Sequence, residues 1–195
     1  ITDRFDEARE SFRKAFRIKN QKGDVRIDEH AILYNHIAKS YEAQGNNKKA
    51  IEFYKKSLST DDSLFFKYPK RYRTSLEGLS YNNFILGNKK LALKGYLEVL
   101  ALREKINDKN GLVFSHSLLG EIYASNKQTK KAIFHTKKAL YLSRELLNKE
   151  RILENLFLLS KLIKGEKGRK YLQEHFVLND SLFKRERSLK NQFAK

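Results

Sequence analysis

Two stretches of the sequence are nearly identical: KKAIEFYKKSL at Lys48–Leu58 and KKAIFHTKKAL at Lys130–Leu140, 82 residues further on. In the first copy Ala50, Tyr54 and Ser57 stand at helical spacing on one face, and the paired lysines fall on the opposite face. A single helix cannot bury such a face by itself. The stretch therefore predicts an amphipathic helix that packs against neighbours built on the same pattern.

The pattern recurs along the chain at a nearly constant period. It appears four times, at spacings of 42, 42 and 40 residues, as Ala8, Phe12, Ala15; Ala50, Tyr54, Ser57; Ala92, Tyr96, Val99; and Ala132, Thr136, Ala139. A second stretch of helical period precedes three of these sets and ends in residues that tolerate left-handed backbone, namely Gly45-Asn46, Gly87-Asn88 and Asn126-Lys127. Each period is therefore expected to be helix, tight turn, helix.

These residues resemble the tetratricopeptide repeat, a family of stacked helix pairs. The resemblance rests on Tyr34, Ile37, Ala38, Tyr41, Gly45, Ala50, Tyr54 and Ser57; on Leu79, Ser80, Gly87, Ala92 and Tyr96; and on Leu119, Gly120, Tyr123, Ala132 and Ala139. It implies an all-α, right-handed α-solenoid of antiparallel helix hairpins with about nine helices. The period exceeds the usual 34 residues and the usual proline after the second helix is missing, so we expect lengthened helices.

The register of the repeats divides the chain. Residues 1–180 are expected to form the solenoid, with the second helix of a truncated repeat at 1–25, repeats at 26–66, 67–108 and 109–148, and a degenerate repeat at 149–180. Asp180 or Ser181 is expected to cap a last capping or linker helix over 181–195, with Leu182, Leu189 and Phe193 on one apolar seam. The absence of Met and the helical patterns at both ends indicate an excised domain.

The composition argues against chemistry within this chain. There is no Cys for a disulfide or thiolate site, and the five histidines have no ligand spacing that favours a metal. Ser115, His116 and Ser117 are adjacent, so their side chains point in different directions on a helix and cannot form a relay by adjacency. We find no phosphate-loop or dinucleotide motif and no apolar run near the roughly 18 residues of a spanning helix, and expect no enzyme, cofactor, metal or membrane segment.

The resemblance implies that a ligand contacts the first helix of each repeat, at positions about four residues apart. The register places there Asn35, Lys39, Glu42, Glu77, Tyr81, Phe84, Ser117, Glu121 and Ala124. This mixture of charges with amide and aromatic groups suits a groove for a protein or peptide segment. Because Glu77 and Glu121 would repel a terminal carboxylate, the sequence argues against the clamp of chaperone-binding members.

Basic side chains suggest an alternative partner. The formal charge is +18, and Arg13, Lys14, Lys55, Lys56, Lys137 and Lys138 take equivalent places on second helices. These residues form either a solvated face or a basic ridge that binds nucleic acid. The aromatic and basic segment at 65–72 could stack on bases beside such a ridge, or it could equally pack between two repeats. Phe134 replaces Glu52 among the lysines of the second copy and places an aromatic on the exposed face. A structural scaffold is a third alternative.

The tail VLNDSLFKRERSLKNQFAK resembles the segment after the last repeat in sensor proteins of Bacteroidetes-type bacteria. This resemblance implies the interaction domain of a bacterial signal-transduction or transcription regulator, with a histidine kinase or helix-turn-helix output domain. It also implies the bacterial cytoplasm or periplasm, without deciding between them. The C-terminal helix is a candidate for homo-oligomer formation.

Overall fold

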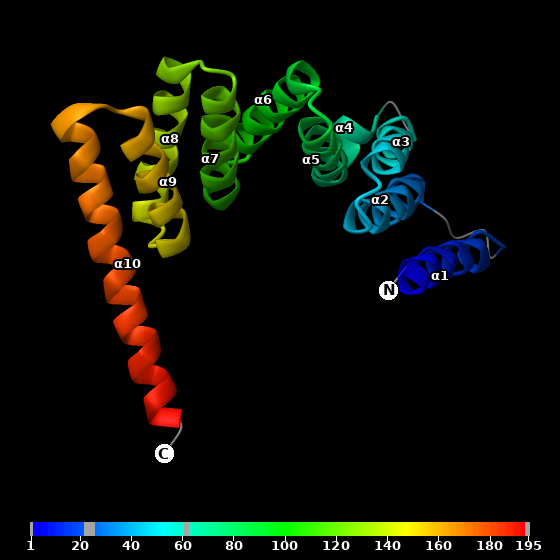
Figure 1. Ribbon diagram of the computed structural model, residues 1–195. Helices are drawn as coiled ribbons and strands as arrows, with labels where there is room; N and C mark the ends of the chain where they lie inside the picture. The colour runs from blue at the N-terminus through cyan, green and yellow to red at the C-terminus, as the bar shows by residue number, and fades with distance from the viewer. Residues whose placement is uncertain (1, 22–25, 61–62, 194–195) are drawn as a thin grey trace. The chain divides into compact units, whose positions relative to one another are not determined.

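The computed structural model describes residues 2–21, 26–60 and 63–193, and over these residues it contains helices and no strands (Figure 1). The helices are α1 Thr2–Gln21, α2 Ile27–Ala43, α3 Asn47–Leu58, α4 Leu64–Lys67, α5 Pro69–Ile85, α6 Lys89–Lys105, α7 Lys109–Ser125, α8 Thr129–Glu145, α9 Lys149–Leu162 and α10 Gly165–Phe193. The all-α expectation is confirmed, with nine long helices in the described residues and the four-residue α4. None of the helices in the described residues is long and apolar enough to cross a bilayer.

The chain divides into two compact units. Unit 1 comprises Ile1–Leu102 and unit 2 comprises Arg103–Lys195. Each unit contains pairs of adjacent helices, α2 with α3 and α3 with α5 in unit 1, and α7 with α8, α8 with α9 and α9 with α10 in unit 2. In both units, long helices that follow one another in the chain thus pack side by side.

Five of the junctions between long helices in the described residues share one backbone geometry, which explains the regular period over this part of the chain. At the end of α2 the N–H of Gly45 donates to the Glu42 carbonyl (2.9 Å) and the N–H of Asn46 to the Tyr41 carbonyl (2.8 Å), which is a Schellman motif with Gly45 in the left-handed region. The same pair of bonds and a positive φ recur at Gly87, Asn107, Lys127 and Leu147. Helices of 17 residues at α5, α6, α7 and α8 with short junctions therefore give a longer hairpin than the usual repeat.

The residue that closes one helix often opens the next. The side chains of Asn46, Asp108 and Asn148 accept hydrogen bonds from the backbone N–H three residues on, at 3.2, 2.9 and 3.1 Å. Each satisfies a donor that the start of a helix leaves without an intrahelical partner. Gln128 occupies the same place before α8 but makes no side-chain cap.

The core of unit 1 is built around Tyr54. Its ring is 1% exposed and packs with Ala38 and Ala50, which are fully buried. A Cβ at Gly78 on α5 would overlap this ring, so the glycine allows α5 to lie close to α3. The Ala-aromatic-small pattern of the sequence thus forms the contact between adjacent helices, as predicted.

Helix α1 joins unit 1 through a polar contact that the sequence pattern did not indicate. Arg9 is 3% exposed, lies over the Tyr41 ring at 4.1 Å, and donates to Ser40 Oγ and Gln44 Oε1, both at 2.8 Å. Phe12, expected to be a packing residue, is 36% exposed and stacks on His36 at 4.8 Å between ring centres. Docking of α1 therefore depends more on hydrogen bonds and ring stacking than on a buried apolar face.

One buried apolar cluster of unit 2 lies among α8, α9 and α10. Leu140, Leu156 and Leu159 form a buried cluster, against which Tyr171 of α10 packs. Gly168 is buried, and a Cβ there would overlap the Ile163 carbonyl. Helices α9 and α10 therefore pack closely at the start of α10.

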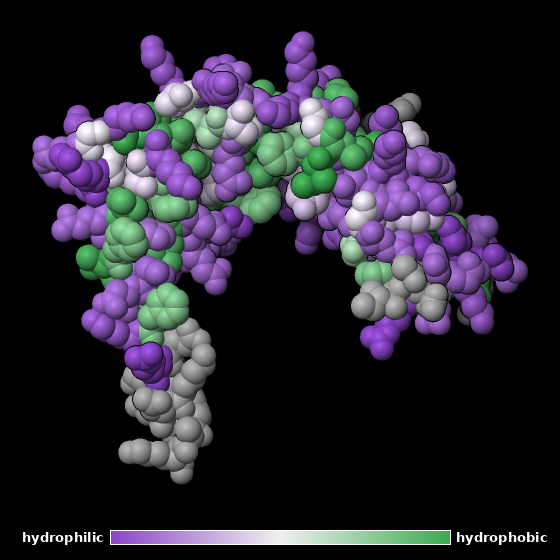
Figure 2. All heavy atoms as spheres, viewed as in Figure 1, coloured by the Kyte–Doolittle hydropathy of each residue, from purple (hydrophilic) through white to green (hydrophobic). Residues whose placement is uncertain are grey.

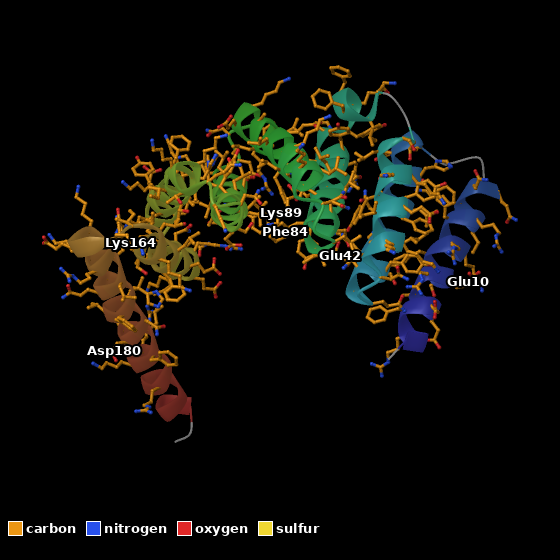
Figure 3. All side chains as sticks on the ribbon, turned by 45° about the horizontal axis from the view of Figure 1, so that its top comes forward. Glu10, Glu42, Phe84, Lys89, Lys164 and Asp180 are labelled. Atoms are coloured by element: carbon orange, nitrogen blue, oxygen red, sulfur yellow. The ribbon has the colours of Figure 1, made fainter. Side chains whose placement is uncertain are left out.

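The expected start of a last helix at Asp180 or Ser181 is wrong. Helix α10 is continuous from Gly165 to Phe193, and Asp180 lies within it (Figures 1 and 3). Asp180 forms an ion pair with Lys184 (2.7 Å), and the Ser181 hydroxyl donates to the Leu178 carbonyl (2.7 Å), so neither side chain caps a helix. The side chains of Leu189 and Phe193, the rest of the predicted seam, lie outside the described part.

Candidate functional site

Two of the predicted ligand-facing residues instead join neighbouring first helices. In unit 1 the amide of Asn35 on α2 donates to Ser57 Oγ (3.0 Å) and to Ser75 Oγ on α5 (2.8 Å), and Asn35 is 6% exposed. In unit 2 the equivalent Ser117 on α7 accepts from the Asn155 amide on α9 (3.0 Å) and is 3% exposed. Both side chains are buried and bond to neighbouring helices inside the stack, and we leave them out of the candidate binding surface.

A second predicted position lies at the edge of the interior. Glu42, labelled in Figure 3, accepts from the Tyr54 hydroxyl (3.1 Å) and from the Asn82 amide of α5 (2.7 Å). Burial and the charge of Glu42 raise the pKa of Tyr54, so this hydroxyl stays protonated and remains a donor. Its register equivalents Phe84 and Ala124 are half-buried. These residues border the exposed surface.

The third predicted position is the one that faces solvent. Lys39 on α2, Tyr81 on α5 and Glu121 on α7 occupy equivalent places, and all three are exposed. Tyr81 is 43% exposed, a large aromatic surface for a side chain in the middle of a helix. Glu77, one turn before Tyr81, is half-buried and pairs with Arg73 (3.5 Å).

Unit 2 adds two aromatic residues that the sequence reasoning missed. Phe114 on α7 is 39% exposed and lies between the guanidinium groups of Arg103 and Arg151, at 5.4 and 5.2 Å. Phe157 on α9 is 42% exposed and has the Lys161 ammonium over its ring at 4.0 Å. Extending the register by 40 residues would have found Phe157 and Lys161, because they follow Ser117 and Glu121 at that distance.

The exposed faces of the first helices therefore carry rings together with both signs of charge. In unit 1 the face consists of Lys39 and Tyr81, and in unit 2 it consists of Phe114, Glu121, Glu154, Phe157 and Lys161. Arg151 donates to Glu154 (2.7 Å), so part of the charge is paired within the surface. We call these residues the first-helix face of each unit.

The predicted basic ridge is exposed but is partly neutralised on α3. Lys14, Lys55, Lys56, Lys137 and Lys138 are exposed, whereas Arg13 is half-buried and pairs with Glu10 (3.6 Å). On α3 Lys56 pairs with Glu52 (2.7 Å) and lies over the Phe53 ring (4.7 Å). Hydrophilic side chains cover much of the face seen in Figure 2, with apolar side chains among them.

The aromatic segment at 65–72 takes part in the packing of unit 1. Phe65 meets the Tyr72 ring edge to face at 5.2 Å, and the Tyr72 hydroxyl donates to Glu98 on α6 (2.6 Å). Burial and this hydrogen bond raise the pKa of Tyr72 to about 12. Phe66, by contrast, is 79% exposed.

The structure pairs two histidines that the sequence reasoning treated separately. His116 on α7 and His135 on α8 lie with their Nδ1 atoms 2.9 Å apart, and they are 7% and 8% exposed. The neighbouring serines have other partners, since Ser115 accepts from Arg103 (2.6 Å) and Ser117 bonds to Asn155. Across the described residues, no group of three or more His, Asp or Glu side chains is arranged to hold a metal.

Comparisons with known proteins agree with this geometry. The sequence profile of the tetratricopeptide repeat family matches residues 1–63, and a second profile of that family matches residues 115–146. The matched residues of each unit are therefore similar to tetratricopeptide repeats. Among curated proteins, none matches the sequence.

Solved structures with the same fold extend over nearly the whole chain. BtubC from P. vanneervenii is 20% identical, with a TM-score of 0.77 over 96% of this chain and 74% of that one. A putative kinesin light chain from Podosopora anserina with nearly identical TPR-like repeats is 17% identical, with a TM-score of 0.72 over 91% and 88% of the two chains. MamA is 19% identical, with a TM-score of 0.62 over 95% and 91%. At such identities the likeness establishes the α-solenoid fold alone.

Proposed function

We propose that this chain is a non-enzymatic module that binds a protein or peptide segment on the first-helix faces. Tetratricopeptide repeats in general act as non-catalytic scaffolds that bind proteins, and the matched residues of each unit are similar to such repeats. The observation that carries the proposal is the set of partly exposed rings Tyr81, Phe114 and Phe157 on first helices, beside charges of both signs. Aromatic side chains of this kind provide much of the binding energy at protein interfaces.

The surroundings of these rings support binding of a peptide with mixed character. The cations over Phe114 and Phe157 stabilise each ring where it lies, which favours binding because less side-chain freedom remains to be lost. Glu121 and Glu154 can pair with basic residues of a ligand, and Lys39 and Lys161 with acidic ones. The proposed ligand is therefore a segment with apolar anchors and interspersed charges.

We further propose that the module belongs to a bacterial signalling or transcription regulator and transmits ligand occupancy along α10. The proposal rests on the resemblance of the tail to sensor proteins and on the continuity of α10 over 29 residues. Tyr171 of α10 packs against the cluster that contains Leu156 and Leu159 of α9. The Phe157 ring of the same helix, which belongs to the first-helix face, lies 5.4 Å from the His175 ring of α10. A ligand at Phe157 thus lies one packing layer from the helix that would carry the signal.

A selection experiment tests the binding proposal. Each peptide selected by phage display on the full chain should bind at least tenfold more weakly to the variant that lacks the ring of its own face, Tyr81→Ala for the face of unit 1 or Phe157→Ala for the face of unit 2, because that ring anchors the ligand. Tyr141→Ala is the matched control, since Tyr141 is an exposed aromatic on the second helix α8. Isothermal titration would measure the affinities, and circular dichroism would show whether the variants remain folded. Peptides unaffected by either first-helix change but weakened by Tyr141→Ala would refute the proposal.

A further inference from the structure

Helix α8 presents two exposed rings with lysines around them. Phe134 and Tyr141 are 56% and 59% exposed and lie seven residues apart, which places them two turns, or about 10 Å, apart on one side of the helix. Lys137 and Lys138 stand between them on the same side, and Lys130 lies one turn before Phe134. We call these five residues the exposed α8 face; it lies opposite the buried Ala132, Thr136 and Ala139.

The positive charges of the exposed α8 face are not neutralised, whereas part of the charge on α3 is. In α3 the carboxylate of Glu52 pairs with Lys56, one turn further on (2.7 Å). The equivalent residues of α8 are Phe134 and Lys138, so the lysine has lost its carboxylate partner and gained an exposed ring. Helix α8 contains five basic residues and a single acidic one, Glu145, which accepts from the Tyr141 hydroxyl (2.6 Å). Within the described residues, no ion pair joins Lys130, Lys137 or Lys138 to a carboxylate.

We propose that the exposed α8 face binds single-stranded nucleic acid. Unpaired bases stack on exposed aromatic rings, and lysines between the rings contact the phosphates that link those bases. A duplex would leave the rings without a stacking partner because its bases are already stacked. An acidic protein segment would pair with the lysines but has no need of two rings, so the combination favours a single strand. The overall charge of +18 would attract such a ligand from a distance.

Fluorescence anisotropy tests this inference. It would measure the affinity of the full chain for a labelled 12-nucleotide single-stranded RNA at salt concentrations between 50 and 200 mM. Phe134→Ala/Tyr141→Ala should weaken binding at least tenfold and leave the salt dependence unchanged, because stacking involves no counterion release. Lys137→Glu/Lys138→Glu should weaken binding at least tenfold and make the slope of log affinity against log salt shallower by about 1.4, the value for two phosphate contacts on a single strand.

The matched control is Lys55→Glu/Lys56→Glu, which makes the same change of charge at the equivalent places of α3. It should change the affinity less than twofold. Equal losses for the α3 and α8 charge variants would mean attraction by overall charge and would overturn the inference. Absence of RNA binding at 50 mM salt would also overturn the inference. So would full displacement of the RNA by poly-glutamate together with an unchanged affinity of the Phe134→Ala/Tyr141→Ala variant, a result that would indicate an acidic protein partner.

Discussion

At the scale of single residues, the buried contact between His116 and His135 ties together the two helices of one repeat. Tyr123 stacks on His135 at 5.3 Å between ring centres, and Phe134 meets the same ring edge to face at 5.1 Å. With Nδ1 atoms 2.9 Å apart, one neutral ring must donate and the other accept. If the accepting Nδ1 also bound a proton, two N–H donors would face each other. The contact therefore depends on pH.

The stability of the chain should therefore fall in mild acid. Burial lowers the pKa of His116 to about 4, with smaller contributions from His135 and Lys138, and burial and Lys131 lower the pKa of His135. The unfolded chain, with histidine pKa values near 6.5, binds protons more readily than the folded one. The contribution of the two histidines to the free energy of unfolding is thus complete above about pH 6.5 and is lost as pH falls toward 4. For His116 this loss is about 3 kcal/mol.

Urea unfolding at pH 7.5 and pH 5 would measure this loss in the parent and in His116→Gln/His135→Gln. The other three histidines remain in both proteins and provide the background. We expect the double variant to lose clearly less stability between the two pH values. An unchanged difference would contradict the account of the pair.

Prediction from sequence succeeded at this scale where the pattern is short and apolar. Ala50, Tyr54 and Ser57 are buried as their spacing requires. It failed for Asn35 and His116, whose burial depends on partners 40 and 19 residues away in the sequence. A polar residue on a helix face carries no local signal that distinguishes a hydrogen bond to the next repeat from contact with a ligand.

At the scale of elements, the junctions show which helix ends were predictable. Gly45 and Gly87 were expected to tolerate left-handed backbone, and they have φ of 74° and 78°. At the third junction the left-handed residue is Lys127 rather than Asn126, and Leu147 also takes a positive φ of 54°. A non-glycine residue in this region costs roughly 1–2 kcal/mol, and the repeated hydrogen bonds and packing of the helices offset that cost.

Leu147→Gly should consequently stabilise unit 2. The Leu147 side chain is 79% exposed, so the change removes little burial while it relieves the strain of a left-handed leucine. We expect a gain of about 0.5–1 kcal/mol, seen as a rise in Tm by differential scanning calorimetry. Leu146→Gly is the control: its φ is −89°, so glycine there gains nothing and should lower Tm. A lower Tm for Leu147→Gly would show that the leucine contributes packing beyond its exposed surface.

The continuity of α10 was missed for a related reason. Asp180 followed by Ser181 is typical of a helix start, because short polar side chains accept from free backbone donors. Inside a formed helix those donors already have partners, and Asp180 pairs with Lys184 instead. Local capping signals predict where a helix can begin, but they do not show whether the preceding residues already form a helix, as residues 165–179 do here.

At the scale of the whole molecule, the fold follows from repetition. One hairpin register predicted the helix pairs in both units, and extending it by 40 residues would also have found Phe157 and Lys161. The pattern could not show which register positions are covered by the next helix pair. In such arrays stability comes from each repeat and its nearest neighbours, so damage should remain local.

Ala132→Arg tests this locality. Ala132 is fully buried, and an arginine there would overpack α7 and α8 and bury a charge, at a cost of more than about 3 kcal/mol. Hydrogen exchange followed by mass spectrometry should show lost protection in α7, α8 and α9, with α2 and α3 unchanged. Equal loss of protection in both units would contradict nearest-neighbour coupling.

The central claim is that first helices bind the partner and second helices build the stack. Hydrogen exchange of the full chain, with and without a saturating peptide from the phage selection, tests it most directly. The account predicts added protection in the first helices of the unit that binds the peptide, α2 and α5 around Tyr81 or α7 and α9 around Phe157, and little change in the middle of α3 and α8. Protection confined to α3 and α8, with α5 and α9 unaffected, would contradict it.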